Sequence, residues 1–346
     1  MLNNLFINIG NWIVDITMRL GGSQALGLWI ERIVAAVVVL VFLLCNVIIL
    51  VYLERKISGF IQERLGPNRM GPFGIFQLFM DILKLVSKNT VTPDRADKFL
   101  YNLVPIVVFI PTMMVFAVMP LGEGMTVYDS PVSLIYYFAV SAFTTLILLL
   151  SGWAANNKYN LMGGMRAAAQ MVSYEIPLLF SLLGIVMLTG SLNLNDIVYD
   201  QLEHGWFIFR QPLAFIIFSI AATAEINRSP FDLAEGEQEL IAGYQTEYSG
   251  MRFAFMYLGE YVAMLAMCWL AAVLFLGGWQ GPILPGWLWL FIKTYIFVLL
   301  NMWVRWTFPR IRIDHMFKLN WKVLIPLAVA NLAITGIVIK ALQFMA

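Results

Sequence analysis

Long apolar stretches recur along the chain and set its predicted architecture. A helix needs about 20 mostly apolar residues to cross a bilayer, and such windows occupy residues 31–52, 102–121, 132–152, 172–190, 256–277, 287–304 and 323–343. A weaker eighth window near 207–224 contains Arg210 close to its end, where a long side chain can reach the headgroups. The pattern predicts an all-α polytopic membrane protein with eight transmembrane helices, folded as a single integral membrane domain over residues 1–346.

Two shorter segments also have helical spacing. In the first 27 residues, which lack the basic start of a secretory signal, apolar side chains recur every three or four positions, at Leu2, Leu5, Phe6, Ile9, Trp12, Ile13, Ile16 and Leu20. This predicts an amphipathic helix on the outer membrane surface that ends at Gly21-Gly22. In residues 73–88 the polar side chains form one narrow stripe, namely Gln77, Asp81, Lys84 and Lys88. The stripe fits a solvated surface helix and equally the lining of a polar passage.

Composition excludes several classes of protein. Apolar residues make up 60% of the chain and charged residues 12%, against about 25% charged in a soluble domain. A formal charge of +1 gives no field for nucleic acid. Two cysteines and two histidines are too few for an iron–sulfur cluster or a tetrahedral zinc site. Residues 66–71 have the spacing of half a phosphate loop, but Pro72-Phe73 stands where Lys-Ser/Thr is needed, so we expect no metal, redox or nucleotide site.

The distribution of basic residues predicts the orientation. Segments 53–100, 153–171, 225–255 and 305–322 hold most of the 22 lysines and arginines, and an eight-span topology places all four on one side. By the positive-inside rule that side is cytoplasmic. Both termini are then outside, and the inside loops 53–100 and 225–255 are the most polar parts of the chain.

The first polar loop begins with Glu54 and Arg55 at the inner end of the first span. A simple ion pair between these two neighbours is the structural alternative to a functional role. Further on, Gly-Pro pairs between residues 66 and 74 predict a tight turn that brings backbone close to a ligand or partner. Near the other end of the chain Arg305, Arg310 and Arg312 form a basic patch, for which headgroup contact is the expected role.

Carboxylates dominate the second polar segment, residues 224–250. Those between 225 and 239 face the single Arg228, so mutual repulsion is expected to raise the pKa of some of them toward neutrality. Pro230 prevents one straight helix and predicts a folded loop. Apolar residues such as Phe231 and Leu240 alternate with the acids, which favours a buried carboxylate chain over an acidic loop that solvates the inside face.

One carboxylate, Glu175, stands inside the fourth span beside Tyr174. An intramembrane carboxylate is a functional hypothesis by default, with a hydrogen bond to Tyr174 as the structural alternative. Glu260, near the inner end of the sixth span, is a secondary candidate of the same kind. Carboxylates through one half of the membrane suggest a proton-conducting protein or an anchor in which a hydrophobic ligand meets partner subunits.

A stand-alone ion transporter is the alternative of another class. Such a transporter is expected to show inverted repeats with paired broken helices. The two polar segments of this chain differ in charge, length and motif, which favours the anchor.

At these segments the sequence resembles a family of membrane subunits of bacterial NADH-quinone oxidoreductase, the H-type subunits, called subunit 1 in mitochondria. These subunits lie next to the hydrophilic arm of respiratory complex I. The matching stretches lie in order along most of the chain: Glu54-Arg55-Lys56, residues 62–69 and 71–74, residues 173–177, 224–232 and 235–250, and residues 309–314. The eight predicted spans and the outward termini agree with that family.

The resemblance implies a role in quinone chemistry and proton movement. A quinone, the substrate, would enter a cavity that this chain partly lines and be reduced by the terminal iron–sulfur cluster of a peripheral-arm subunit. The quinone-binding residues would be Glu54, Arg55, Asp81, Lys84 and Arg305. The residues that couple reduction to proton translocation, through antiporter-like and small membrane-arm subunits, would be Glu175, Glu225, Arg228, Asp232, Glu235, Glu237, Glu239 and Glu247. No catalytic residue is expected on this chain, and flavin and iron–sulfur clusters would be in partner subunits.

Some family members carry a carboxylate in the third span, and residues 132–152 contain none here, which leaves Glu175 with water as the alternative route. Anchor subunits of ferredoxin-, deazaflavin- or hydrogenase-linked relatives are similar, so the electron donor is the open alternative within the fold class. The expected location is the bacterial plasma (inner) membrane.

Overall fold

The regular secondary structure is entirely helical in the part of the chain that the computed structural model describes, residues 5–19, 23–234 and 236–345. Seven helical segments there are long and apolar enough to cross a membrane. They are α2 (Gln24–Ile61), α4 (Lys98–Met114), α5 (Ser133–Ala154), α6 (Lys158–Thr189), α11 (Met251–Phe275), α12 (Gly286–Thr307) and the nearly continuous α13 (Ile313–Leu319) and α14 (Ile325–Met345). The predicted all-α membrane architecture is therefore confirmed, and each of these segments overlaps one of the strong apolar windows.

The prediction of eight spans is not confirmed. The window near 207–224 forms a short turn, α8 (Phe207–Arg210), and a separate helix, α9 (Pro212–Glu225), of 14 residues. At 1.5 Å per residue α9 is about 21 Å long, shorter than the ~30 Å hydrocarbon core. The break lies at Gln211, where the backbone leaves the helical region before Pro212, which has no N–H to continue a helix.

Although short, α9 runs antiparallel to α6. The side chain of Gln211, at the start of α9, lies beside Gly184 in the second half of α6. At the other end of α9, Gln170 in the first half of α6 donates to the carbonyl of Ala224 at 2.7 Å. Therefore α9 carries the chain back along α6 toward the end of the bundle where α6 begins.

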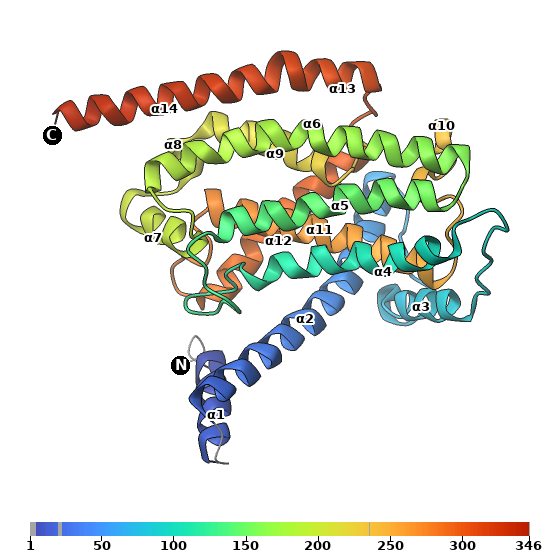
Figure 1. Ribbon diagram of the computed structural model, residues 1–346, viewed down its shortest axis with the longest axis horizontal. Helices are drawn as coiled ribbons and strands as arrows, with labels where there is room; N and C mark the ends of the chain where they lie inside the picture. The colour runs from blue at the N-terminus through green and yellow to red at the C-terminus, as the bar shows by residue number, and fades with distance from the viewer. Residues whose placement is uncertain (1–4, 20–22, 235, 346) are drawn as a thin grey trace.

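The most buried helix is α11, which packs against α2, α4 and α12. Trp269, in its second half, is completely buried and donates to the carbonyl of Pro120 at 2.9 Å. Its ring meets Phe42 of α2 and Phe291 of α12 edge to face. The first half of α2 and the N-terminal α1 (Leu5–Arg19) extend away from the bundle (Figure 1).

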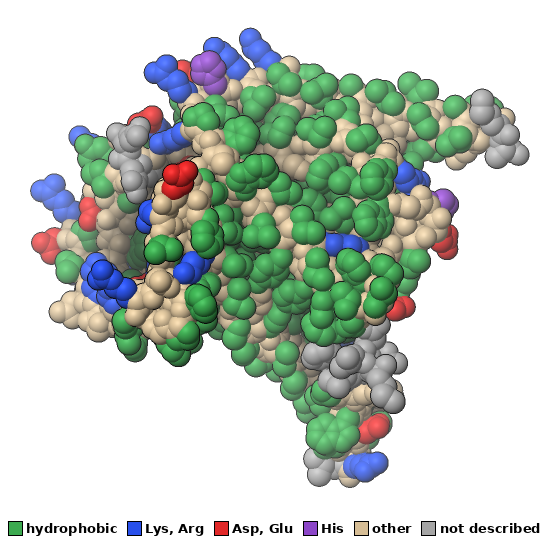
Figure 2. Space-filling view, turned by 180° about the vertical axis from the view of Figure 1, so that it is seen from behind, with side chains coloured by type: hydrophobic (Ala, Val, Ile, Leu, Met, Phe, Trp, Pro, Cys, Tyr) green, Lys and Arg blue, Asp and Glu red, His purple; other side chains and the backbone are tan. Residues whose placement is uncertain are grey.

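The four basic segments predicted to lie on one side, residues 53–100, 153–171, 225–255 and 305–322, meet at one end of the bundle. This is the end that carries α3, α10 and α13 in Figure 1. We call it the polar end. The contacts that join the segments are Arg228 with Glu54, Arg305 with Glu54, Ile311 N with Pro230 O, and Asn156 with Arg95 O. Lys and Arg side chains gather here, and a mostly apolar surface covers the middle of the molecule (Figure 2). This grouping agrees with the predicted topology, while the membrane face to which the polar end belongs stays a prediction.

Both predicted amphipathic segments form helices. In α1, Gly10, Val14 and Thr17 approach α2, and Ile9 and Trp12 are exposed. Its placement on a membrane surface stays a prediction, and the predicted stop at residues 21–22 lies outside the described residues. The second helix, α3 (Gln77–Ser87), is shorter than the predicted 73–88, because a 3-10 turn (Pro72–Gly74) precedes it.

Candidate functional site

The C-terminal part of α2 carries a buried carboxylate, Glu54, whose two oxygens both have charged partners. Arg228 NH1 lies 2.7 Å from Oε2 and Arg305 NH1 lies 2.5 Å from Oε1, while the hydroxyl of Tyr261 donates to Oε2 at 2.7 Å. The simple pair with Arg55 that the sequence allowed is wrong, because neighbours on a helix do not face each other.

Arg228 lies at the centre of this group, with its side chain 2% exposed. Its guanidinium lies 4.4 Å over the ring of Tyr261, and Nε is 3.4 Å from Oε1 of Glu260. Burial alone would lower the pKa of Arg228, but the carboxylates of Glu54 and Glu260 raise it well above its ordinary value. We call Glu54, Arg228, Glu260, Tyr261 and Arg305 the Glu54 cluster, which brings together two carboxyl groups and two guanidinium groups.

A second ion pair joins α2 to α3 one residue further along α2. The guanidinium of Arg55 contacts Asp81, which also accepts from Gln77 at 3.2 Å. A cavity of about 570 Å³ adjoins this pair and is lined by Arg55, Ser58, Arg64, Leu65, Gly66, Pro67, Asn68, Arg69 and Gln77. In the predicted stripe, Gln77 thus lines the polar cavity and Asp81 forms the ion pair with Arg55. Lys84 and Lys88 of the same stripe are exposed.

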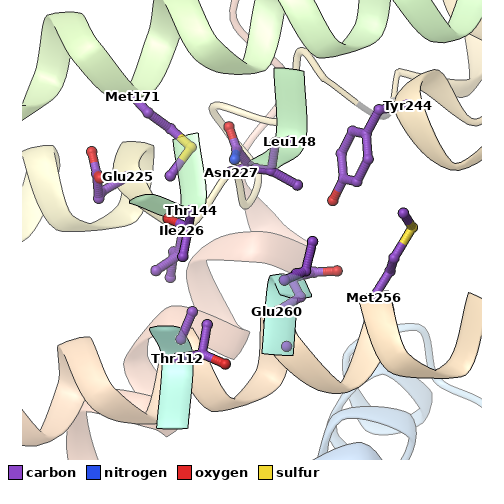
Figure 3. Close-up of a pocket in the computed structure, with 13 residues that line it drawn as sticks. Thr112, Thr144, Leu148, Met171, Glu225, Ile226, Asn227, Tyr244, Met256 and Glu260 are labelled. Atoms are coloured by element: carbon purple, nitrogen blue, oxygen red, sulfur yellow. The ribbon is translucent and has the colours of Figure 1, made fainter. Parts of the chain in front are cut away.

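Glu225, the last residue of α9, is buried beside a small cavity. The cavity has a volume of about 50 Å³, and Glu260 lines it too. In Figure 3, Glu225 and Met171 lie to one side of the cavity and Tyr244 to the other. Among the described residues, Oε2 of Glu225 has no hydrogen-bond partner. The cavity therefore places a free carboxylate oxygen between α9 and the Glu54 cluster.

Two residues of α6 fix the turn that follows Glu225. Gln170, which is completely buried, donates to the carbonyls of Ala224 and Phe231, each at 2.7 Å. Tyr174 packs its ring against Phe231 and donates to the carbonyl of Met316 at 3.0 Å. That bond occupies the Tyr174 hydroxyl, so the predicted structural alternative for Glu175, a hydrogen bond to Tyr174, is not seen. Glu175 is half-buried and close enough to Glu225 for their charges to interact.

The remaining predicted carboxylates do not form one buried chain. Asp232 lies near enough to Glu260 for their charges to interact. Glu239 is 55% exposed and pairs with Arg166 at 2.5 Å, and Glu247 accepts from Asn157 at 2.5 Å. Glu239 is not among the carboxylates with a raised pKa, because its hydrogen bond with Arg166 lowers the pKa of that carboxyl. Glu235 lies outside the described residues, as does the side chain of Glu237, whose backbone begins α10 (Glu237–Leu240).

Sequence reasoning gave little weight to several residues of the site. Glu260 was only a secondary candidate, and Tyr261, Thr112, Thr144 and Asn227 were not considered. Their signal in the sequence is weak, because hydroxyl and aromatic side chains are common in apolar helices. Only their position next to Glu54 or Glu225 distinguishes them.

Comparisons with known proteins show the family that the chain resembles. The model of the NADH dehydrogenase family matches residues 34–336. The H-type subunit of the NADH-quinone oxidoreductase of Carboxydothermus hydrogenoformans is 47% identical over 306 residues, which is 87% of each chain. The corresponding subunits of Bacillus cytotoxicus and Geobacillus kaustophilus are 54% and 52% identical, over 84% and 82% of this chain and 88% and 87% of theirs.

Proposed function

This chain belongs to the NADH dehydrogenase family and is a membrane subunit of an NADH-quinone oxidoreductase, and from that premise we propose that it lines the quinone cavity and starts proton transfer. The observation that carries the proposal is the Glu54 cluster with Glu225 beside it. The charged groups of the cluster join α2, the loop after α9, α11 and α12 at the polar end. Burial of such charges costs several kcal/mol unless each is paired or hydrated.

The quinone side of the proposal rests on the cavity beside Arg55 and Asp81. Its volume of about 570 Å³ is in the usual range of small-molecule sites, about 300–1,000 Å³. Arginine and glutamine side chains line it, which suits the carbonyl and hydroxyl oxygens of a quinone headgroup. Several apolar side chains at and after the start of α3, namely Phe76, Phe79, Ile82 and Leu83, are exposed and suit an isoprenoid tail. Lys84 and Arg305 are proposed neighbours of the headgroup.

The proton side of the proposal rests on how the Glu54 cluster can rearrange. Reduction of a quinone adds two electrons and takes up two protons, so a group near Arg305 and Glu54 that supplies a proton becomes more negative. Among the described residues, Nε and NH2 of Arg228 have no hydrogen-bond acceptor, and Glu260 is only 3.4 Å from Nε. When the ion pair between Glu54 and Arg228 weakens, the guanidinium of Arg228 can turn toward Glu260. The nearer positive charge favours release of a proton from the Glu260 carboxyl into the cavity at Glu225. Glu175 and Asp232 are the proposed continuation.

The proposal assigns the remaining parts of the reaction to partner subunits. A peripheral subunit with an iron–sulfur cluster would dock at the polar end and deliver electrons, and flavin would be further along that arm. Antiporter-like and small membrane-arm subunits would receive the coupling signal. The chain is an integral membrane protein, and we propose the bacterial inner membrane with both termini outside. Alone it is expected to be inactive.

The test begins with a tagged chain extracted from its native membranes in mild detergent. We expect a large assembly that reduces quinone with NADH, and we expect Glu225→Gln to lower that rate about tenfold or more, as loss of a proton-transfer group does. Reduction of ferricyanide by NADH, which does not need the quinone cavity, should be unchanged. Glu203→Gln, an exposed glutamate of α7 (Leu194–His204) at the opposite end of the bundle, is the matched control. A tagged chain that emerges alone and stable contradicts the proposal, as does full quinone reduction in the assembled Glu225→Gln variant.

A further inference from the structure

Two small cavities adjoin each other at Glu225, and the second leads away from the Glu54 cluster. The first, of about 50 Å³, reaches Glu260 and Asn227, and the second, of about 40 Å³, reaches Tyr137 and Ser141. Six residues line both: Thr112, Thr144, Met171, Glu225, Ile226 and Ala263. The pair of cavities therefore extends from α11 past the end of α9 into the interface between α4 and α5.

Hydroxyl groups are the polar lining that α4 and α5 contribute. The sequences of these two helices contain no acidic residue, so a proton that leaves Glu225 in this direction meets no second carboxylate. Instead Thr112 of α4 and Thr144 and Ser141 of α5 line the second cavity.

The hydrogen bonds of these hydroxyls leave only their oxygen lone pairs available to other partners. Each donates its hydrogen to a backbone carbonyl one turn earlier in its own helix: Thr112 to Phe109 at 2.8 Å, Thr144 to Ser141 at 2.5 Å and Ser141 to Phe138 at 3.0 Å. Their oxygen lone pairs are left to accept. A water molecule that donates to these oxygens keeps its own lone pairs free, and a neighbouring protonated carboxyl can donate to them.

The site has the size and polarity that ordered water needs. A water requires about 10–15 Å³ of accessible space and two to four polar partners, so each cavity can hold a few. Two buried polar atoms, Oε2 of Glu225 at the junction and Oδ1 of Asn227 in the first cavity, have no hydrogen-bond partner among the described residues. Such atoms are costly to bury unless water satisfies them.

We propose that Thr112, Thr144 and Ser141 position a short water chain that carries protons between Glu225 and the α4–α5 interface. The inference rests on the proposed function and adds three positioning residues to it. In each step an O–H bond of the donor breaks as one forms on the acceptor water, which passes a different proton onward, so only charge moves. The hydroxyls keep their own hydrogens on backbone carbonyls and hold the waters in line.

Valine has nearly the shape of threonine but carries a methyl group in place of the hydroxyl, so it tests the proposal. In the full assembled complex we expect Thr112→Val and Thr144→Val each to lower the rate of NADH-driven quinone reduction and of proton pumping about fivefold, the loss of one hydrogen-bond partner for water. The double variant should lose more, and its solvent deuterium isotope effect should rise. Ferricyanide reduction should be unchanged, and Thr112→Ser and Thr144→Ser should restore the rates.

Thr145→Val is the matched control. Thr145 is next to Thr144 on α5 and is buried, but its hydroxyl contacts the sulfur of Met171 at 3.7 Å and lines neither cavity. Wild-type pumping in the double valine variant would overturn the inference and leave the proposed function standing. Equal losses in Thr145→Val and the cavity variants, or no rescue by serine, would show a packing role and also overturn it. Absence of NADH-driven quinone reduction in the unmodified assembly would instead overturn the proposed function.

Discussion

Arg228 and Glu54 form a buried ion pair, with 2.7 Å between NH1 and Oε2, although 174 positions separate them in the chain. The pair fastens the loop after α9 to the C-terminal part of α2. It also brings Glu260 and Arg305 into one group of interacting charges. The loop and α2 are therefore electrostatically coupled, so a change in charge on one alters the interaction energy of the charged groups on the other.

Loss of Arg228 is expected to destabilise the chain. Arg228→Met leaves Glu260 without its cation and Glu54 with one fewer, and removal of one partner from a buried pair costs about 3–5 kcal/mol. The measurement is the amount and thermal stability of assembled complex in native membranes. Arg210→Met is the control, because its pair with Asp200 is partly exposed and is worth about 0–1 kcal/mol. Equal effects of the two substitutions would contradict the central role of Arg228.

Asp81→Asn is expected to weaken quinone binding more than turnover. The neutral side chain loses its ion pair with Arg55, which frees the guanidinium beside the large polar cavity and loosens α3. We expect the KM for a short-chain quinone to rise about tenfold, with a smaller change in kcat. Asp94→Asn removes the same charge from an exposed position after α3 and should leave the KM unchanged. A loss confined to kcat would argue against this cavity as the quinone site.

Lys293 is expected to matter for stability and not for proton transfer. The residue is 4% exposed, and its ammonium donates to the carbonyls of Leu276, Gly278 and Gln280 at 2.6, 2.9 and 2.6 Å. A hydrogen bond to a charged group contributes about 1.5–3 kcal/mol, so Lys293→Met should destabilise the chain by at least about 3 kcal/mol. Thermal melting of the purified complex measures this. Quinone reduction per assembled complex should stay at the wild-type level, and its selective loss at normal stability would show a functional role.

The surface pair between Arg166 and Glu239 is expected to be sensitive to acid. Hydrogen bonding to Arg166 lowers the pKa of Glu239 below its unfolded value, so the stabilisation is present above about pH 4.3 and is lost as the pH falls through the lower, folded value. Because Glu239 is 55% exposed, the contribution is at most about 1 kcal/mol. Hydrogen exchange of residues 239–242 should be faster in Arg166→Gln than in the wild type at pH 7. The difference should vanish below the folded pKa, and a difference that persists there would exclude this pair as its cause.

Apolar periodicity was a reliable guide to the helices but a poor guide to their ends. The window 31–52 lies inside α2 (Gln24–Ile61), whose C-terminal part is polar and carries Glu54. A hydropathy window stops at such residues, whereas the helix continues because Arg228 and Arg305 neutralise the buried charge. The apolar window at 207–224 predicts a span for a different reason. Hydropathy does not register the break at Gln211, and the resulting α9 is held by its contacts with α6.

The sequence by itself determined that the chain is an integral membrane protein, because 60% apolar residues in long windows leave few other solutions for the backbone. It also pointed to Glu54, Arg228 and Glu225, since ionisable groups in so apolar a chain are conspicuous. Only the tertiary structure decided which charges meet. Pairing depends on helix rotation and packing across more than a hundred residues, which local spacing does not encode. That is why Glu54 pairs with Arg228 instead of Arg55, why Glu239 lies at the surface, and why hydroxyls of α4 and α5 line the cavities at Glu225.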